Sequence, residues 1–477
     1  MPGEPSEVAR DVVRTMAGRP SDWRLERPST PNAPRVGLHW VGPILAVASM
    51  LVGWLVFKDA QSKERDGMVG FALFIGSVSI LLMAWSNILS TRLRVIEKLF
   101  GGLDRVYLWH RWFGALAVGA MWLHTQTVDD VKGIAGAARR TAKAAEELAG
   151  TATNFLYALV AISLLRWIPM RWWRLTHKLL IIPYVFACWH FYTATKPYAN
   201  DSGWGRWFLA FMLAGIAAWL YRVVWRDMLN RGKSHRVARI ERVDDTLVLD
   251  LEPFGRPLRF VAGQFAFLKF SLPGMSEPHP FTIASSPSDG ALRFMIRDLG
   301  DWTSRLGEVV RVGTHVRVEG PYGGLELEPP HGGGEVLWIA GGVGITPFIG
   351  AALTRQPDNA VVPHLFYCVR SRIDAPGLAD LERAHVKGRI VLHLHASAEG
   401  SRLTTADIAG TFGEGGLQGA HVVMCGPHSL VRAMRQAVRD LGARHVHVEA
   451  FDIRSGIGPD LSRDVDRLLR EWRLLRR

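Results

Sequence analysis

Two pairs of histidines lie in long apolar segments of the chain, His110 and His124 in one segment and His177 and His190 in another. Imidazole nitrogens are common ligands of haem iron, and an iron held on both faces needs two of them. Each ionisable side chain inside a membrane is costly and calls for a partner. A single such histidine is as readily explained by a hydrogen bond to a neighbouring helix. For the set of four, we predict axial ligands of two b-type haems.

The spacing within each pair determines how a helix would present the rings. Fourteen residues from His110 to His124 span roughly 21 Å and leave the side chains about 40° apart around the axis. One helix can therefore hold two haems within a bilayer core of about 30 Å. The thirteen residues from His177 to His190 would turn these rings about 140° apart on an ideal helix. Pro183 lies between them, and we predict a kink or a change of register there.

Length and composition indicate a membrane protein with two or three domains. The chain has 477 residues and a net charge of +13, which on charge alone is compatible with nucleic-acid binding. Its 18 Trp, 21 Phe and long apolar runs instead favour a membrane protein with a basic cytoplasmic rim, and no nucleic-acid partner is expected. The three cysteines, Cys188, Cys368 and Cys425, have neither metal-type spacing nor a disulfide framework.

Six apolar segments predict a transmembrane domain over residues 38–226, because each is near the ~20 residues that a spanning helix needs. Their approximate ranges are 38–57, 68–88, 105–126, 151–168, 174–194 and 204–224. Residues 1–37 are expected to form a cytoplasmic tail without a cleavable signal peptide. Lys and Arg are in excess in this tail and in the even-numbered loops, so these are predicted to face the cytoplasm. The third loop, residues 127–150, is an external lid or a solvated spacer, of which we prefer the spacer.

This orientation puts His110 and His177 near the cytoplasmic side and His124 and His190 near the outer side. Basic residues accompany the inner pair, and they either meet haem propionates or reflect the positive-inside bias alone. They are Arg111, Arg174 and Lys178.

Beyond the apolar segments, two further domains are predicted. Alternating short strands over 233–330 indicate an antiparallel β-barrel, and strand–helix alternation over 331–454 indicates a doubly wound parallel sheet. Residues 455–477 form a candidate amphipathic helix that packs back on the domain or touches anionic lipid, with packing the preferred interpretation.

An aromatic residue beside hydroxyls follows one strand of the predicted barrel, in the segment His279-Pro280-Phe281-Thr282-Ile283-Ala284-Ser285-Ser286-Pro287. This combination suits a planar ring with polar edges, although alone it is also compatible with a plain turn. Downstream, Arg297 and the segment from Gly300 to Thr303 offer a cation, a tight turn and a hydroxyl for a diphosphate.

A glycine-rich turn, Ala340-Gly341-Gly342-Val343-Gly344-Ile345-Thr346-Pro347, lies between a predicted strand and a helix. Glycines there let backbone N–H groups close on a pyrophosphate at the helix N-terminus. Cys425-Gly426-Pro427 ends a later strand, at the edge where such sheets bind ligands. Cys425 is either a small packing residue or a neighbour of a nicotinamide ring.

The chain resembles the NADPH oxidase and ferric reductase superfamily in eight ordered segments: HRWFG at His110, WLH at His124, THKLL at His177, CWHF at His190, HPFTIASSP, GPYGG, AGGVGITP and CGP. The resemblance spans residues 38–453. It implies a membrane α-helical bundle of six transmembrane helices, an antiparallel β-barrel FAD domain and a doubly wound α/β NAD(P)H domain.

The resemblance assigns site residues position by position. It implies that His110 and His177 bind the inner haem and that His124 and His190 bind the outer haem. The flavin would contact His279, Pro280, Phe281, Thr282, Ser285, Ser286, Arg297, Gly300 and Thr303. The nicotinamide cofactor would contact Gly341, Gly342, Gly344, Thr346, Pro347, Arg370, Ser371, Arg372, Cys425, Gly426 and Pro427. Phe281, Thr282 and Cys425 are expected beside the reacting rings, and two cations at 370–372 favour NADPH over NADH.

One departure concerns the C-terminal end of the match. Relatives commonly close with an aromatic residue over the flavin, whereas Ile453 stands at this position. Displacement of a stacked aromatic by the nicotinamide is therefore less firmly implied.

The function implied is electron transfer from cytoplasmic NAD(P)H through FAD and two haems to an acceptor on the outer face of the cell membrane. Oxygen and ferric chelates both suit a one-electron donor, and no residue set decides between them. A different class is an electron-transfer subunit that donates to a membrane or periplasmic protein. A haem-free membrane anchor is a third reading, which loss of a histidine would have favoured. The sequence makes no prediction of oligomeric state.

Overall fold

The structure is a computed structural model that describes residues 40–449 apart from ten short gaps. The gaps are 62–66, 128–135, 166–167, 169, 195, 197, 230–231, 330–333, 357–360 and 414–415. The expected tail at 1–37, Ile453 and the candidate helix at 455–477 lie outside the described residues.

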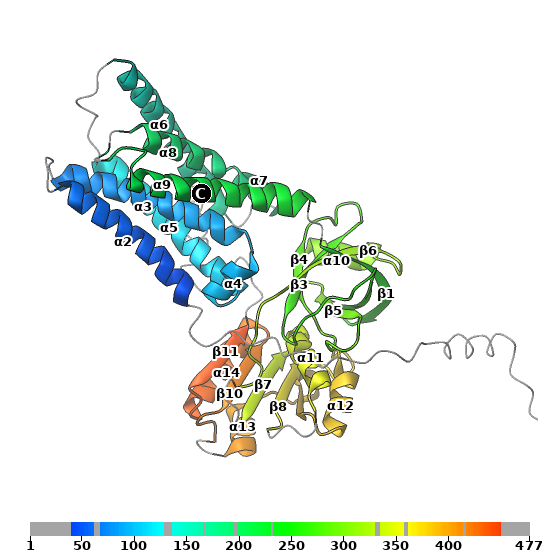
Figure 1. Ribbon diagram of the computed structural model, residues 1–477. Helices are drawn as coiled ribbons and strands as arrows, with labels where there is room; N and C mark the ends of the chain where they lie inside the picture. Colours follow the sequence, from blue (N-terminus) through cyan, green and yellow to red (C-terminus); the bar gives the residue numbers. More distant parts are fainter. Residues whose placement is uncertain are drawn as a thin grey trace, which may run out of the picture. The chain divides into compact units, whose positions relative to one another are not determined.

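The first half of the described chain is helical (Figure 1). Its elements are α2 (Val41–Gln61), α3 (Gly67–Ser90), α4 (Arg94–Phe100), α5 (Leu103–Thr127), α6 (Gly136–Leu164), α7 (Met170–Lys178), α8 (Ile181–Thr193), α9 (Gly203–Leu220) and a π-helix, η2 (Tyr221–Leu229). Three stretches are long and apolar enough to cross a membrane: Gly70–Ser90, Lys143–Leu164 and Gly203–Arg226. The other three expected spans are helical at α2, α5 and α7 with α8, but they do not meet the same criterion of length and hydropathy within the described residues.

Two features of the helical half bear on the sequence predictions. The helix α6 begins at Gly136, so the part of the 127–150 loop from Gly136 onward is helical and continuous with the fourth segment. The fifth segment is interrupted at Leu179–Leu180, between the two histidines it carries. There Ile182 N donates to Leu179 O at 3.0 Å, a three-residue step. Pro183 has no N–H to bond Leu179 O and its ring crowds that carbonyl, which explains the predicted break.

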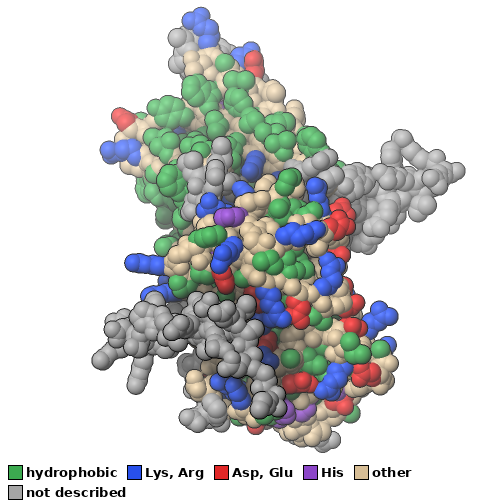
Figure 2. Space-filling model, turned by 90° about the vertical axis from the view of Figure 1, so that its right-hand side faces the viewer, with side chains coloured by type: hydrophobic (Ala, Val, Ile, Leu, Met, Phe, Trp, Pro, Cys, Tyr) green, Lys and Arg blue, Asp and Glu red, His purple; other side chains and the backbone are tan. Residues whose placement is uncertain are grey.

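The helices pack through a buried core and expose apolar side chains outward. Tyr184, Met121 and Leu156 belong to one cluster that joins α8, α5 and α6. Figure 2 shows hydrophobic side chains gathered on the upper part of the visible face, over these helices, whereas Lys, Arg, Asp and Glu are more frequent on the lower part. Large outward apolar surface is typical of helices that contact lipid.

Residues 233–322 form a six-stranded antiparallel sheet. The strands are β1 (Lys233–Val243), β2 (Thr246–Pro253), β3 (Phe265–Phe270), β4 (His279–Thr282), β5 (Leu292–Arg297) and β6 (His315–Tyr322), in the order β4-β3-β6-β1-β2-β5. A bridge between Ile283 and Phe294 connects the two edges, so the sheet curls toward the predicted barrel. Alternating residues such as Val237, Leu249 and Phe294 fill its interior. One helix, α10 (Asp301–Val309), follows β5.

Residues 336–449 form a five-stranded parallel sheet with helices on both faces (Figure 1). Its strands are β7 (Val336–Gly341), β8 (His364–Val369), β9 (Val391–Ala396), β10 (His421–Cys425) and β11 (His445–Glu449), in the order β11-β10-β7-β8-β9. The helices are α11 (Thr346–Thr354), α12 (Leu378–Val386), α13 (Thr405–Phe412) and α14 (His428–Asp440). In β7, Trp338 faces the α11 and α12 core and Ile339 faces the α13 and α14 core. Strands β8 and β9 lie on one side of β7, and β10 and β11 lie on the other side. Sheets of this type bind ligands at the point where the strand order reverses, which is here between β7 and β10.

Candidate functional site

Two of the four histidines face each other. His110 of α5 and His177 of α7 have ring centroids 6.0 Å apart and planes inclined by 63°. Two imidazoles on opposite faces of one metal, with metal–nitrogen distances of about 2 Å, would have centroids separated by roughly 6 Å. The indole of Trp173 stacks on His177 at 4.8 Å and fixes the plane of that ring. The couple of His110 and His177 therefore has the separation that two imidazole ligands of one metal would have.

The second pair lies fourteen and thirteen residues beyond the first pair in the sequence. His124 lies in α5, as His110 does, whereas His190 lies in α8 and His177 in α7. A Cβ at Gly76 of α3 would come within 2.8 Å of His124 Nδ1, so only glycine leaves room for this ring. Lys196 donates hydrogen bonds to the carbonyls of Phe191 and Ala194 at 2.9 and 3.3 Å and so caps the end of α8.

The hydrogen bonds of the rings leave their Nε2 atoms available. His110 Nδ1 lies 2.9 Å from Ser86 O, and His124 Nδ1 lies 2.8 Å from Ala72 O. A carbonyl only accepts, so Nδ1 carries the proton in both rings and Nε2 keeps its lone pair. Metal-bound histidines almost always make such a second bond. His177 Nδ1 lies 3.3 Å from Ser163 Oγ, whose own proton goes to Leu159 O at 2.8 Å.

His190 departs from this arrangement, because its Nδ1 is buried without a hydrogen-bond partner among the described residues. The part of the chain that the structure describes also holds no cluster of three or more His, Cys, Asp and Glu able to bind a metal. A porphyrin supplies four nitrogens itself, so two histidines complete the coordination of its iron. The couple of His110 and His177 thus fits the two positions that a haem iron leaves to the protein.

The predicted flavin motif forms strand β4 at the edge of the antiparallel sheet. The indole of Trp302, from α10, stacks on His279 with centroids 3.9 Å apart and lies 6.1 Å from the Phe281 ring. Thr282 Oγ1, His279 Nε2 and Trp302 Nε1 are all buried without hydrogen-bond partners among the described residues. Buried polar atoms are normally paired, so these atoms indicate missing polar partners. His279 stacks on Trp302 on one face of β4, whereas Thr282, three residues further along the strand, points to the other face.

The side chain of His279 is neutral at physiological pH. Burial and the positive charge of Arg174 lower the pKa of His279 to about 4. Its Nε2 lies 3.7 Å from Glu277, which forms an ion pair with Arg174 at 3.3 Å. Arg174 is on α7, one turn before His177, so this ion pair connects the strand of the flavin motif with the helix of the inner histidine couple.

The predicted diphosphate residues follow β5. Arg297 Nε donates to Asp245 Oδ2 at 2.7 Å and its side chain is 40% exposed. Thr303 Oγ1 accepts from Leu299 N and Gly300 N at 2.9 and 3.1 Å, which closes the turn at the start of α10. The hydroxyl is thus used to shape the turn.

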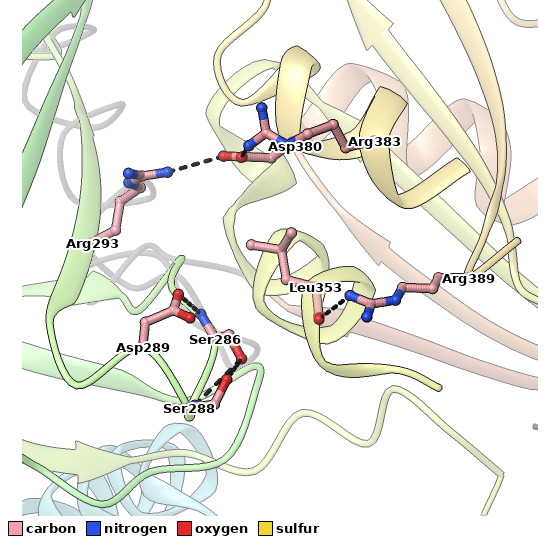
Figure 3. A pocket seen from close by; sticks show the side chains of 8 residues that line it. All are labelled: Ser286, Ser288, Asp289, Arg293, Leu353, Asp380, Arg383 and Arg389. Atoms are coloured by element: carbon pink, nitrogen blue, oxygen red, sulfur yellow. Dashed lines mark hydrogen bonds and ion pairs between the residues drawn. The ribbon is translucent and has the colours of Figure 1, made fainter. Parts of the chain in front are cut away.

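Two further predicted flavin residues follow β4, and the second of them contacts the parallel-sheet domain. Ser285 Oγ accepts from Arg293 N at 3.2 Å, and Ser286 Oγ lies 3.2 Å from Thr354 Oγ1 of α11. Figure 3 shows Ser286 with Ser288 at a polar cavity of about 370 Å³. Across it, Arg293 Nη1 donates to Asp380 Oδ2 at 3.0 Å and joins β5 to α12. Ser286 and the pair of Arg293 and Asp380 thus join the two domains, whereas the Ser285 side chain bonds within the barrel.

The glycine-rich turn and the Cys425 segment meet at the reversal point of the parallel sheet. Cys425 pairs with Ala340 across β10 and β7. A Cβ at Gly344 would lie 2.4 Å from Cys425 O, and a Cβ at Gly341 would lie 2.7 Å from Pro427. Glycine is needed for this close approach of two strand ends. Thr346 and Pro347 begin α11 directly after the turn, and Gly342 has φ 53°. The Cys425 side chain is fully buried.

The three residues after β8 have different surroundings. Arg370 is exposed, and its guanidinium makes no hydrogen bond or ion pair within the described residues. Arg372 pairs with Glu382 at 2.5 Å, and its backbone N donates to Glu399 Oε1 at 2.9 Å. Ser371 Oγ accepts from Ile373 N at 3.4 Å. Arg370 is thus the cation of this group that is available for a phosphate.

Sequence reasoning missed the groups that orient these side chains. Ser86, Ala72 and Ser163 are distant in sequence from the histidines they contact, and nothing in their local pattern marks them. It also missed Arg226 and Glu319, which join the helices to the barrel. The one available signal was that Glu319 directly precedes Gly320-Pro321-Tyr322-Gly323-Gly324, a segment noted for the resemblance but given no role.

Comparison with known proteins places two of these regions in families. Residues 75–188 match the ferric reductase like transmembrane component, and residues 230–326 match an FAD-binding domain. The first range contains His110, His124 and His177, and the second contains the whole β4 motif. The fourth histidine, His190, lies two residues beyond the first range.

Individual relatives match parts of the chain. The reductase component of the naphthalene 1,2-dioxygenase system of Pseudomonas putida is 29% identical over 211 residues, covering 41% of this chain and 62% of the relative. Human dual oxidase 1 is 35% identical over 105 residues, or 20% of this chain and 7% of the relative. Respiratory burst oxidase homolog protein E of Arabidopsis thaliana is 27% identical over 208 residues, or 36% and 20%. The chain therefore spans less than two thirds of each of these relatives.

Among solved structures, the ferredoxin reductase of carbazole 1,9a-dioxygenase is similar with a TM-score of 0.39 and 21% identity, over 46% of this chain and 69% of that chain. The two matched families together define a membrane flavoprotein with oxidoreductase character. The chain belongs to the NADPH oxidase and ferric reductase superfamily, in which a ferric-reductase-like membrane component and an FAD-binding domain occur in one chain.

Proposed function

We propose that this protein moves electrons from cytoplasmic NAD(P)H, by way of FAD and two b-type haems, to an acceptor on the outer face of the cell membrane. The single observation that carries the proposal is the facing couple of His110 and His177, at 6.0 Å, connected through Arg174 and Glu277 to the strand of the flavin motif. When bound, FAD takes up a hydride and the haem irons carry single electrons, and this redox chemistry belongs to the cofactors.

The residues of the chain bind, orient and insulate these groups. Nε2 of His110 and His177 would hold the inner iron, and Nε2 of His124 and His190 the outer iron. Ser86 and Ala72 fix the tautomer of two of these rings through their carbonyl oxygens. If two histidine nitrogens held each iron, no coordination position would remain open, and an acceptor would take up the electron without coordination to iron.

In the flavin site, Thr282 and His279 would supply polar contacts to the ring edge and Phe281 an aromatic contact. Gly341, Gly342 and Gly344 would let the nicotinamide cofactor approach the backbone at the start of α11. Arg370 would bind the adenosine phosphate of NADPH, with Ser371 and Arg372 beside it. Arg372 is already paired with Glu382, so we assign the selectivity for NADPH mainly to Arg370.

The acceptor defines two versions of this function. Oxygen, reduced to superoxide, and a ferric chelate both accept single electrons. The alternative class is a subunit that donates to a protein partner in the membrane or periplasm. For that role, α6 from Gly136 offers an extended charged segment, with Arg140 and Lys143 in its first turns.

The test is anaerobic reduction of the purified protein by NADPH, followed by separate addition of oxygen and ferric citrate while the haem spectrum is timed. We expect two haems per chain, reduced by NADPH and reoxidised faster by the physiological acceptor. A haem content of zero would refute the relay. Reduced haems that neither reagent reoxidises would favour the protein-partner version.

A further inference from the structure

A compact set of charged and aromatic contacts joins the helices to the antiparallel barrel. We propose that Arg226 and Glu319 form a docking contact that positions the flavin motif relative to the inner histidine couple. This inference rests on the proposed function, because the positioning concerns the transfer of electrons between flavin and inner haem.

Arg226 is the centre of this contact. It lies on the π-helix η2 at the end of the last membrane segment, and its side chain is only 6% exposed. Its Nε donates to Glu319 Oε1 at 2.9 Å, and its Nη atoms donate to Glu319, Tyr322 OH and Thr91 O. Tyr322 OH in turn donates to Glu319 Oε1 at 2.9 Å. One guanidinium therefore binds the α3–α4 connection and strand β6 together.

A second arginine reinforces the same carboxylate. Arg92 has φ 55°, an uncommon conformation for a residue other than glycine, and its side chain is 10% exposed. Its guanidinium lies 3.8 Å from the centroid of the Phe267 ring in β3 and 3.7 Å from Glu319 Oε1. Its Nε donates to Tyr107 OH of α5 at 2.6 Å. Two nearly buried cations thus share one carboxylate, so loss of Glu319 would leave both without their counter-charge.

The contact continues along the segment after Glu319. Glu97 Oε1 of α4 accepts a hydrogen bond from Gly323 N at 2.7 Å. Phe267 and Tyr322 belong to the same buried cluster as Phe100 and Leu103 of the helical half. Charge, hydrogen bonding and apolar burial therefore act at one place. This combination fixes orientation as well as proximity, because a directed hydrogen bond restricts the angles at which two bodies meet.

This contact is connected by a few residues to the flavin motif on one side and to His110 on the other, the two sites between which the proposed electron transfer takes place. On the barrel side, Phe267 pairs with Pro280 of the flavin motif across β3 and β4. On the membrane side, Thr91 lies five residues after Ser86, whose carbonyl holds His110. Movement at Arg226 and Glu319 would thus change the distance between flavin motif and histidine couple. Neither residue touches a reacting group, so both are positioning residues.

The test compares Glu319→Gln and Arg226→Gln, singly and combined, with Glu252→Gln as matched control. Glu252 forms an ion pair with Arg236 at 2.8 Å on the same barrel, but both side chains are about half exposed. Two rates are measured in the full-length protein under anaerobic conditions. One is NADPH-driven reduction of ferricyanide, which reports flavin turnover, and the other is the rise of reduced haem.

We expect ferricyanide reduction within twofold of the unaltered protein and haem reduction slowed at least about tenfold, since misplacement by about 1 Å can cost a hundredfold. The double variant should be no slower than the worse single variant, because both remove one interaction. The control should match the unaltered protein. Unchanged haem reduction in both single variants would overturn the inference, and so would an equal loss of ferricyanide reduction, which would mean a role in folding or flavin retention.

A second readout does not depend on any cofactor. Amide hydrogen exchange at Gly323, whose N–H is held by Glu97, should accelerate in Glu319→Gln and stay unchanged in Glu252→Gln. Absence of any acceleration would refute the docking contact itself. If the unaltered protein showed no haem reduction while this exchange effect was present, the proposed function would fail and the contact would stand.

Discussion

The rings of His110 and His177 face each other with centroids 6.0 Å apart, although they belong to different helices and distant parts of the sequence. His110 is held by Ser86 O and His177 is covered by Trp173. A ring that is fixed on one side and leaves Nε2 free on the other is prepared to bind a metal before the metal arrives.

Replacement of His110 by alanine should remove the inner haem. The free energy of iron binding depends on both axial nitrogens, so we expect haem content to fall from two to about one per chain, measured by pyridine haemochrome absorbance. His315→Ala is the matched control, because His315 is an exposed histidine of β6. An unchanged haem content in His110→Ala would contradict the ligand assignment.

Replacement of Ser163 by alanine should retain the haem but change its redox potential. Ser163 Oγ accepts from His177 Nδ1, and this bond makes the ring a stronger electron donor to iron. Its loss should raise the midpoint potential of one haem in a spectroelectrochemical titration. Ser90→Ala serves as control, since Ser90 Oγ bonds only Asn87 O within the described residues. A downward shift would contradict the assigned direction of the hydrogen bond.

Replacement of Thr282 by valine should have opposite effects on the flavin-free and flavin-bound protein. Thr282 Oγ1 is buried without a partner, so its removal should leave the thermal stability of the flavin-free protein unchanged or higher. The same change should weaken FAD binding by about tenfold, equivalent to about 1.4 kcal/mol for one lost hydrogen bond. Calorimetric FAD titration and unfolding scans measure the two effects. Equal FAD affinity would place the flavin edge elsewhere.

Replacement of Arg370 by alanine should raise the KM for NADPH at least about tenfold and leave the KM for NADH within twofold, since a charge-assisted hydrogen bond contributes roughly 1.5–3 kcal/mol. Arg372→Ala should have a smaller effect, because Arg372 is already paired with Glu382. Steady-state ferricyanide reduction with each nucleotide gives the values. An equal rise for both nucleotides would rule out the assigned phosphate contact.

The stability of the flavin domain should decrease in acid partly through His279. Burial and Arg174 lower the pKa of His279 to about 4, from the model-peptide value of 6.5. Between these pH values the unfolded chain binds more protons than the folded protein, so the free energy of unfolding falls as the pH falls from about 6.5 to 4. Above pH 6.5 this contribution is fully present.

The measurement is the pH dependence of thermal unfolding in detergent, with and without His279→Gln. In the variant, the slope of the free energy of unfolding against pH should decrease between pH 4 and 6.5 by the equivalent of up to one bound proton. Identical slopes would mean that His279 titrates normally. Other histidines with lowered pKa values, such as His364 and His393, remain in both proteins and cancel in this comparison.

Much of the architecture was predictable because its signals are local. Alternation of apolar residues marked the antiparallel sheet, and the order of strands and glycines marked the parallel sheet. Pro183 marked the break between α7 and α8, since proline acts on the turn that directly precedes it. Gly341 and Gly344 were predicted as part of a phosphate-binding turn, and in the structure they let the ends of β7 and β10 approach closely. The six spans were expected from apolar length, and three of them meet the stricter criterion of length and hydropathy.

Only the tertiary structure determined which residues far apart in the sequence contact each other. Sequence named His110 as a candidate ligand, but only packing of α3 against α5 brings Ser86 O to its ring. Sequence placed Ser286 in the flavin motif, whereas the fold turns it into the seam against Thr354. Nothing in the local sequence distinguishes Arg226 from other basic residues near the end of a membrane segment. Its pairing with Glu319 depends on how helices and barrel meet, and residue type and spacing do not encode a contact between segments 93 positions apart.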